Sequence, residues 1–210
     1  MPAGASERVG DAAAIGVALQ AGEPVEDEAF DGLYPQIQRL RAGVHWTPVR
    51  IALRVAELLA PAPGGHVIDV GAGVGKVCII GALRTPLVWH GIERGGAMVR
   101  SARNAARRLG VADRTHFVEG DALTVDLAPF GGCYLYNPFA EALFKGTPAE
   151  RASGAAFLDE VQALARKLAT LRADSRLVTY FGFGGAVPEG FELVERERHG
   201  HDELCLWIRR

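Results

Sequence analysis

The chain has 210 residues, of which 49% are hydrophobic and 23% are charged, and its formal net charge is −2. This length suits one globular domain with a sizeable core and is short for two. The near-neutral charge argues against a global basic field that would attract nucleic acid, and it leaves a local patch open. Cys78, Cys133 and Cys205 lie far apart in apolar runs, which predicts buried reduced thiols.

Neither a metal site nor a membrane segment is expected. The six histidines show no metal-ligand spacing. The N-terminus has no basic segment followed by an apolar core, and no apolar run reaches the ~18 residues of a membrane span. We therefore expect a soluble cytoplasmic protein without a bound metal ion and without a membrane partner.

Residues 1–46 predict a helical cap. Residues 9–21 are alanine-rich with a weak helical pattern, and residues 27–42 form either one amphipathic helix or two short ones, with a kink at Pro35. This section is too small to fold alone, so we expect it to pack on the following domain, residues 47–210, as a cap or lid.

The second section begins with a helix whose start is marked by Thr47 and Pro48. Thr47 is a good N-cap and Pro48 suits the first helical position. His45 and Trp46 precede this start, and two interpretations stay open for them. They either pack against the core at the helix entry or edge a ligand pocket.

Strand and helix patterns then alternate. Five apolar strands are predicted at residues 66–70, 87–93, 115–119, 133–136 and 176–181, with helices at 74–83, 97–109 and 148–171. Two further strand-like runs, 191–196 and 203–208, are joined by so short a turn that they must be antiparallel. The pattern predicts one α/β domain with a mostly parallel sheet.

The first strand, residues 66–70, leads directly into Gly71, Gly73 and Gly75 and then into a helix. Glycines permit a tight turn and close approach of a ligand to the backbone, because they carry no Cβ atom. The helix that follows directs its free N–H groups and the positive end of its dipole at the same place. The stretch therefore predicts a site for a nucleotide-like ligand.

Three polar residues, Glu93, Asp121 and Asn137, fall at the carboxyl ends of predicted strands. In an open α/β sheet these ends converge on one crevice, together with the glycine turn. Each residue alone has a structural explanation: Glu93 as a helix cap, Asp121 in an Asx turn, and Asn137 in the turn that Pro138 imposes. Their common position at strand ends favours a binding site.

The choice between NAD and S-adenosylmethionine depends on the residues around the glycines. Glu93 lies 22 residues after Gly71, where a carboxylate accepts hydrogen bonds from ribose hydroxyls of either cofactor. The glycine spacing is not G-x-G-x-x-G, and Asp69 would repel a pyrophosphate. The terminal hairpin also leaves no room for a second substrate domain. These features favour S-adenosylmethionine.

Residues 69–75, Glu93, residues 120–123 and residues 136–139, in this order and spacing, resemble the class I S-adenosylmethionine-dependent methyltransferases, above all small bacterial ones of unassigned substrate. The resemblance covers residues 47–210. It implies a three-layer Rossmann-like sheet of strand order 3-2-1-4-5-7-6 with an antiparallel last strand. The cofactor-binding residues that it implies are Asp69, Gly71, Ala72, Gly73, Gly75, Glu93, Arg94, Asp121, Ala122 and Asn137.

Residues 136–139 also resemble the Asn/Asp-Pro-Pro-Tyr/Phe motif of amino-methyltransferases, but the second proline is missing, which argues against base or glutamine acceptors. By this resemblance Asn137 and Phe139 lie at the methyl acceptor. From its position, His45 is a candidate general base. The expected pocket walls are Tyr34, Trp46, Tyr136 and Pro138. The expected acceptor is an N or O nucleophile of a small molecule or a protein side chain, with no indication of nucleic acid.

Two other functions remain as alternatives: an NAD-dependent oxidoreductase, and a non-catalytic module that keeps the fold and the cofactor. Methyl transfer from a sulfonium needs mainly in-line positioning and exclusion of water, so the sequence requires no covalent nucleophile. The oligomeric state stays open.

Overall fold

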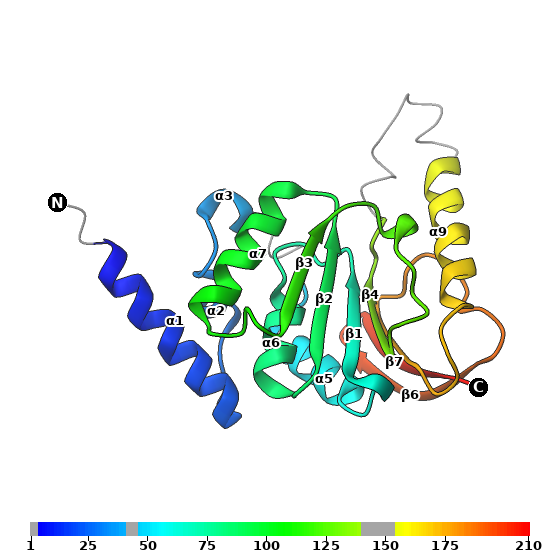
Figure 1. The fold of residues 1–210 in the computed structure, drawn as a ribbon, viewed down its shortest axis with the longest axis horizontal. Helices are drawn as coiled ribbons and strands as arrows, with labels where there is room; N and C mark the ends of the chain where they lie inside the picture. Colours follow the sequence, from blue (N-terminus) through cyan, green and yellow to red (C-terminus); the bar gives the residue numbers. More distant parts are fainter. Residues whose placement is uncertain (1–3, 41–45, 140–153) are drawn as a thin grey trace.

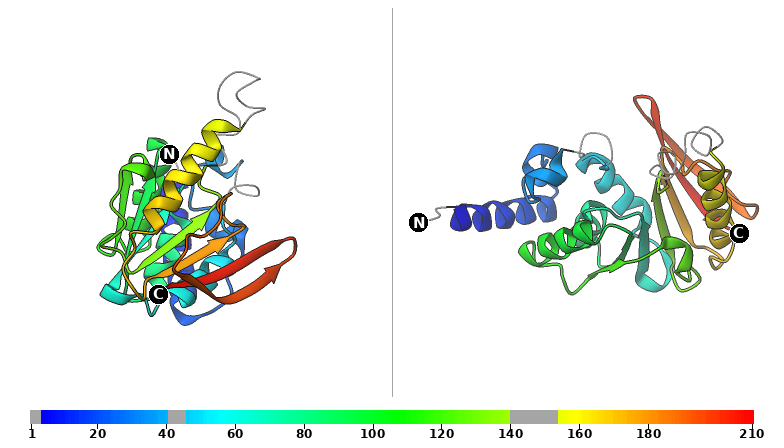
Figure 2. Two further views of the ribbon diagram at one scale, coloured as in Figure 1. Left: turned by 90° about the vertical axis from the view of Figure 1, so that its right-hand side faces the viewer. Right: turned by 90° about the horizontal axis from the view of Figure 1, so that it is seen from above.

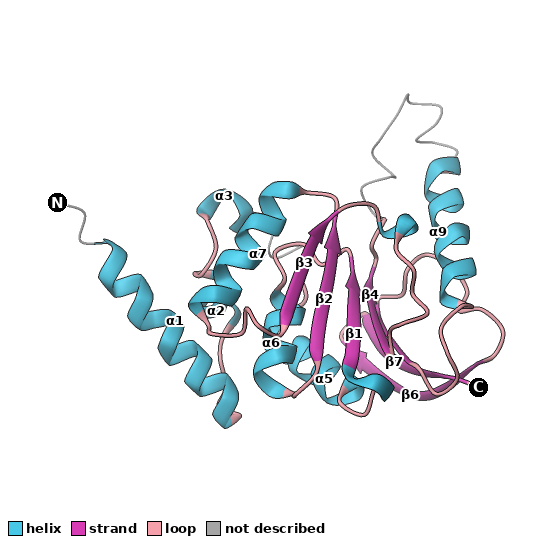
Figure 3. Cartoon of the chain, in the orientation of Figure 1, coloured by secondary structure: helices cyan, strands magenta, loops and turns pink. Residues whose placement is uncertain are grey.

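The structure, a computed structural model, describes residues 4–40, 46–139 and 154–210. Its centre is a seven-stranded sheet in the order β3-β2-β1-β4-β5-β7-β6 (Figure 1 and Figure 3). The strands are β1 (His66–Val70), β2 (Val88–Glu93), β3 (Thr115–Glu119), β4 (Gly132–Tyr136), β5 (Arg176–Tyr180), β6 (Phe191–His199) and β7 (Asp202–Arg209). The predicted strand order and α/β class are confirmed.

The strand directions place several strand ends together. β1 pairs in parallel with β2 and β4, β2 with β3, and β4 with β5. β7 is antiparallel to both β5 and β6, as predicted for the terminal hairpin. The carboxyl ends of β1 to β5 and the start of β7 therefore lie at the same end of the sheet, where open α/β folds bind their ligands.

Helices cover both faces of the sheet. Alternate strand residues point to opposite faces, so that Val67 and Trp89 share a buried cluster with α5, α6 and α7, whereas Ile68 and Leu135 pack with α9. Figure 2 shows α9 and the β6–β7 hairpin at the opposite end of the molecule from α1. The helices are α1 (Gly4–Ala21), α2 (Asp27–Asp31), α3 (Gln36–Arg39), α5 (Val49–Leu59), α6 (Lys76–Arg84), α7 (Gly96–Arg108) and α9 (Ala155–Leu168), with 3-10 turns η1 (Pro63–Gly65) and η2 (Ala122–Thr124).

The layer of helices on the α9 side of the sheet does not extend over β1, β2 and β3, because the β3–β4 connection contains only the 3-10 turn η2.

Three histidines, one from each of β1, β2 and β3, lie side by side on this face of the sheet. His66 Nδ1 lies 3.1 Å from His90 Nε2, and the rings of His90 and His116 are 5.1 Å apart. Burial, with smaller contributions from His116 and His66, lowers the pKa of His90 to about 4. His90 is therefore neutral near pH 7.

Within residues 4–40, 46–139 and 154–210, no group of three His, Cys, Asp or Glu side chains is arranged to hold a metal ion. In the same ranges no helix is long and apolar enough to cross a membrane. Cys78, Cys133 and Cys205 are free and buried, as the sequence predicted.

The cap forms two short helices, α2 and α3, with Pro35 at the N-cap position of α3. This confirms one of the two predicted alternatives. Phe30 and Leu33 belong to the same buried cluster as α5 and α6, so the cap shares the core of the sheet domain. The division into a cap at residues 1–46 and a domain at residues 47–210 stays a prediction.

The prediction that Thr47 caps α5 is wrong. The helix begins at Val49, with Pro48 at the N-cap position, and the buried Thr47 hydroxyl lies 2.9 Å from the Tyr134 hydroxyl. The Val49 amide donates instead to Asp27 Oδ1 at 2.8 Å. A distant residue of the cap supplies the capping oxygen, because Thr47 already has a partner in the core.

Two other helix boundaries differ from the prediction. α6 begins at Lys76 instead of residue 74, because Gly75 is left-handed at φ 76° and cannot be the second residue of a helix. α9 ends at Leu168, three residues before the predicted end. The described part of α9 begins at Ala155, and most of its predicted first turns lie outside the described residues.

Both edge strands carry features that oppose the addition of another strand. β6 has alternating charges from Glu195 to Arg198 and a bulge between Leu193 and Glu195. Successive residues of a strand direct their backbone groups to opposite sides. On β3 the even-numbered residues face β2, as the bonds of the Arg114 carbonyl and the Gly120 amide show, so the carbonyl of Phe117 faces the open edge. Arg103 Nε donates to that carbonyl at 3.1 Å.

Candidate functional site

The glycine turn lies between β1 and α6. Gly71, Gly73 and Gly75 all have positive φ angles of 81°, 55° and 76°. A Cβ atom on Gly75 would lie 2.5 Å from the Phe117 ring, and one on Gly71 would lie 3.2 Å from Pro138 Cβ. The turn therefore requires glycine for its backbone shape and for its packing.

Glu93, at the end of β2, holds the glycine turn in place. Its carboxylate accepts hydrogen bonds from the Gly73 amide at 3.0 Å and from the Gly95 amide at 2.7 Å. The second bond ties the same side chain to the start of α7, which combines the predicted capping role with a position beside the glycine turn. Two carboxylate oxygens can accept about four hydrogen bonds, so acceptor capacity remains for a ligand.

Asp69, the fourth residue of β1, is a nearly buried acid with 4% of its surface exposed. Its hydrogen-bond partner is the weakly donating Cys78 thiol, with Sγ 3.9 Å from Oδ2. Burial, and secondarily the charge of Glu93, raises the pKa of Asp69 to about 8. Asp69 therefore holds a proton at neutral pH in the ligand-free protein.

A small cavity of about 40 Å³ lies beside Asp69 and the glycine turn. It is lined by residues of the turn and of the neighbouring elements: Trp46, Thr47, Asp69, Gly71, Ala72, Gly73, Val74, Lys76, Val77, Tyr134 and Tyr136. Ligand sites commonly measure ~300–1,000 Å³. A ligand of nucleoside size therefore requires this cavity to widen.

Lys76 was not predicted to have any role at the site. It is the first residue of α6, only 4% exposed, and its Nζ lies 2.5 Å from Asp27 Oδ1 and 2.7 Å from Asp31 Oδ1. Nζ also lies 5.6 Å from the centre of the Phe30 ring. A cation at a helix N-terminus is unfavourable because it opposes the helix dipole. The lysine directly after the glycines therefore indicates from the sequence that acidic side chains lie nearby.

Arg94, Asp121 and Ala122 are brought together at the ends of β2 and β3. Arg94 donates to Asp121 Oδ1 at 3.0 Å and to Glu160 Oε1 on α9 at 2.7 Å. Asp121 also accepts from the Leu123 amide at 2.9 Å, which forms the predicted Asx turn around Ala122. Their assignment to cofactor binding stays a prediction.

Residues 137–139 form a turn that contacts the glycine turn. Asn137 has a φ of 40°, and Pro138 packs on Gly71. Phe139 is only 3% exposed, lies in the core on the α9 side, and has the Arg94 guanidinium 5.8 Å from its ring centre. Phe139 is therefore covered in this conformation, and its contact with an acceptor stays a prediction that requires the ring to become exposed.

The expected pocket walls lie on the cap side of the sheet. Tyr34 is buried, its ring is 5.1 Å from that of Trp46, and its hydroxyl has no hydrogen-bond partner among the described residues. The rings of Tyr136 and Tyr180 are 5.1 Å apart. Trp46 and Tyr136 line the small cavity, whereas Tyr34 lies behind Trp46. His45, the candidate base, lies outside the described residues.

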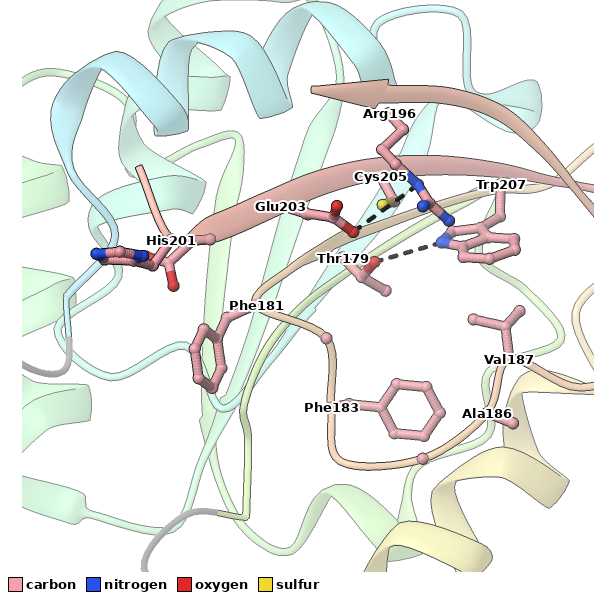
Figure 4. Close-up of a pocket in the computed structure, with 13 residues that line it drawn as sticks. Thr179, Phe181, Phe183, Ala186, Val187, Arg196, His201, Glu203, Cys205 and Trp207 are labelled. Atoms are coloured by element: carbon pink, nitrogen blue, oxygen red, sulfur yellow. Dashed lines mark hydrogen bonds and ion pairs between the residues drawn. The ribbon is translucent and has the colours of Figure 1, made fainter. Parts of the chain in front are cut away.

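A larger hollow of about 610 Å³ lies beside β5 and β7, against the loop that follows β5 (Figure 4). Its apolar wall includes Phe181, Phe183 and Trp207, and its charged groups are Arg196, Asp202 and Glu203. This hollow is not the cavity at the glycine turn. The segments that line them are joined by one backbone hydrogen bond: the amide of Asn137, which follows Tyr136 of the small cavity, donates to the carbonyl of Gly182 of the hollow at 3.0 Å.

No family model matches the chain. It is 35% identical over 97 residues to ribosomal RNA small subunit methyltransferase A of Thermosynechococcus vestitus, a match that covers 44% of this chain and 34% of that protein. It is 33% identical over 129 residues to an O-methyltransferase of Penicillium expansum, covering 61% of this chain and 42% of that protein. The matches thus span about two fifths of these relatives or less.

The fold is similar to that of an RNA methyltransferase from Salinibacter ruber solved with S-adenosyl-L-homocysteine. The TM-score is 0.58 at 21% identity, and the likeness covers 78% of this chain and 92% of that one. The chain has the fold of the class I S-adenosylmethionine-dependent methyltransferases. In this methyltransferase fold, the glycine turn, Glu93, Asp121 and Asn137 stand at adjacent strand ends, as the sequence predicted.

Proposed function

We propose that the protein is an S-adenosylmethionine-dependent methyltransferase that acts on an N or O nucleophile of a small molecule or a protein side chain. The observation that carries this proposal is the pair of acids around the glycine turn: the buried Asp69 before it and Glu93 against Gly73. A cytoplasmic location is part of the same proposal.

The two acids favour this cofactor on electrostatic grounds. An ammonium and a sulfonium would favour the ionised form of Asp69 and would be attracted to both carboxylates. A pyrophosphate would be repelled by Glu93 and would gain nothing from a protonated Asp69. The relatives by sequence are methyltransferases, and the fold is that of class I methyltransferases. Both findings support S-adenosylmethionine as the cofactor. The relatives include both a ribosomal RNA methyltransferase and an O-methyltransferase, so they do not agree on the acceptor.

Each group then has a specific task. When bound, S-adenosylmethionine supplies an activated methyl group on a sulfonium. Glu93 would accept hydrogen bonds from the ribose hydroxyls, and Asp69 would face the positively charged end of the cofactor. Asn137, beside the glycine turn, would orient the acceptor atom in line with the methyl group. A general base is needed only for an acceptor that carries a proton at the working pH.

Isothermal titration with S-adenosylhomocysteine and, separately, with NAD tests the proposal. We expect S-adenosylhomocysteine to bind with a micromolar dissociation constant and NAD not to bind. Binding of NAD alone, or of neither ligand, would contradict the proposal. A radiolabelled methyl-transfer screen against metabolite, protein and RNA pools then distinguishes an active methyltransferase from a non-catalytic module that only binds the cofactor. Tight cofactor binding with no labelled product in any pool would identify a non-catalytic module.

Asp69 makes cofactor binding proton-linked. With a pKa of about 8, Asp69 is mostly protonated at pH 7 in the free protein. The positive charges of S-adenosylmethionine favour the ionised carboxylate, so binding at pH 7 is expected to release close to one proton. Titrations in phosphate and in Tris, whose ionisation enthalpies differ, measure this release as a difference in apparent enthalpy.

Asp69→Asn is the control for that measurement, because it cannot release a proton in this range. Equal apparent enthalpies for the natural protein in both buffers would contradict the assignment.

The same pKa predicts how the stability of the free protein depends on pH. The folded state keeps a proton that the unfolded chain releases near pH 4, so the contribution of Asp69 to stability is full below pH 4 and is lost as the pH rises toward 8.

A further inference from the structure

Phe181, directly after β5, is held in an unusual conformation. Its φ is 60°, in the left-handed region that bulky side chains avoid, and 59% of its surface is exposed. Its amide donates to the Glu203 carbonyl on β7 at 3.0 Å, which fixes the backbone there. An apolar ring is thus kept in solvent by a strained backbone. Strain that the surroundings enforce is typical of functional sites.

The strain is concentrated where the predicted acceptor lies. Among the described residues, three non-glycine residues have positive φ: Asn137, Asp174 and Phe181. Two of them are neighbours, because the Asn137 amide donates to the carbonyl of Gly182, the residue after Phe181. Pro138 then packs on Gly71. A continuous chain of contacts therefore joins Phe181 to the glycine turn.

The loop after β5 separates two aromatic rings. Figure 4 shows the Phe181 ring on one side of the loop and the Phe183 ring on the other. Phe183 is buried and packs in the core, so it is a structural residue. Phe181 also lines the hollow of about 610 Å³, but its ring is free. Phe139, by contrast, is covered by Arg94 and buried.

The charges around the hollow favour certain ligands. Arg196 carries one positive charge, and its Nε lies 3.8 Å from Glu203 Oε2. Asp202 and Glu203 carry two negative charges, so the lining itself has an excess of one negative charge. Arg198, outside the lining, has its Nε 3.6 Å from Glu203 Oε1 and partly offsets the charge of that carboxylate, so the negative excess is centred on Asp202. The faces of aromatic rings are also electronegative. This lining disfavours an anionic ligand and accepts a neutral or cationic one.

We infer that Phe181 is the stacking surface for a planar acceptor, and that this acceptor is a neutral or cationic aromatic amine or nitrogen heterocycle. The inference rests on the proposed function and narrows its substrate class. Such a ring would stack on Phe181 and place its nitrogen near Asn137. The same chemistry occurs in a free small molecule, which is the acceptor argued for here, and in an unpaired nucleobase within RNA, which lies outside the proposed function.

Binding of defined probes to protein saturated with S-adenosylhomocysteine tests the inference. Tryptamine is the aromatic cation, 2-cyclohexylethylamine the matched alicyclic cation, and indole-3-acetate the matched anion. We expect tryptamine to bind more tightly than both, and Phe181→Ala to weaken its binding about tenfold, because stacking on one ring is lost. Guanosine and a short single-stranded RNA, added in the same way, distinguish a free heterocycle from a base within RNA.

Phe181→Gly gives an independent measurement, because glycine accepts a φ of 60° without strain. This variant is expected to melt about 2–4 °C higher than the natural protein, while it loses tryptamine binding as Phe181→Ala does. Asp174→Gly is the matched control: its φ is 63°, and it lies before β5, at the other end of that strand. It is expected to raise the melting temperature and to leave probe binding unchanged.

The outcomes separate the two proposals. Failure of S-adenosylhomocysteine to bind would overturn the proposed function and this inference with it. Normal S-adenosylhomocysteine binding with equal affinity for tryptamine and 2-cyclohexylethylamine would overturn the inference alone. Tryptamine binding that is unaffected by both Phe181 variants would do the same. A gain in melting temperature without a loss of probe affinity would show that the strain serves no aromatic contact.

Discussion

Replacing Lys76 with methionine is expected to lower the free energy of unfolding by about 2–4 kcal/mol, because two carboxylates lose their partner. Asp31 is largely buried, and burial already raises its pKa although Lys76 partly offsets the effect. Asp27 is about half exposed, which places the expected loss below that of a fully buried pair. Urea denaturation at pH 7 measures the difference.

Two variants make this result specific to the Lys76 cluster. Lys76→Met combined with Asp31→Asn is expected to recover part of the loss, because the unpaired buried charge is removed. Arg210→Met removes an exposed ion pair with Glu192 and is expected to change stability by about 1 kcal/mol or less. If Lys76→Met and Arg210→Met lowered the free energy of unfolding equally, burial would not strengthen the ion pairs of Lys76 with Asp27 and Asp31.

Replacing Glu93 with alanine is expected to weaken S-adenosylhomocysteine binding by about 1.5–3 kcal/mol, the contribution of a charged hydrogen bond. This corresponds to roughly a 10- to 150-fold higher dissociation constant. The variant also loses the bonds to the Gly73 and Gly95 amides, so the glycine turn is less firmly held. Isothermal titration provides the measurement.

The structure offers a matched control one strand away. Glu119 stands in register with Glu93 at the end of β3 and is exposed. Glu119→Gln is expected to leave affinity within about twofold, because an exposed charge contributes little. If Glu93→Ala bound S-adenosylhomocysteine as tightly as the natural protein, the assignment of Glu93 to the ribose would be wrong.

Local sequence patterns predicted the frame of the molecule well. The strands β1 to β5 and β7 were recognisable from short, mostly apolar runs, and the glycine turn from its spacing, since both signals lie within a few consecutive residues. β6 extends to His199, three residues beyond its predicted end, because its second half is charged and carries no apolar signal. The strand ends of Glu93, Asp121 and Asn137 followed from the alternation of strands and helices. The resemblance to methyltransferases then supplied the strand order, which periodicity alone could not have provided.

The errors concern partners that are distant in the sequence. Thr47 resembles an N-cap in every local respect, but it bonds to Tyr134, 87 residues later. Lys76 became notable only when α2 was seen to place two acids beside it. The motif at residues 136–139 drew attention to Phe139, whereas the exposed ring belongs to Phe181, which directly follows the neighbouring strand β5. Such pairings depend on tertiary packing.

The two protected sheet edges bear on how this protein behaves at high concentration. Unpaired backbone groups on an outer strand are templates on which a second chain can continue a sheet. Here the bulge and the charges of β6 oppose that continuation, and Arg103 already occupies the Phe117 carbonyl on β3. The seven-stranded sheet therefore ends within one molecule, so concentrated samples should resist fibrous aggregation through sheet edges.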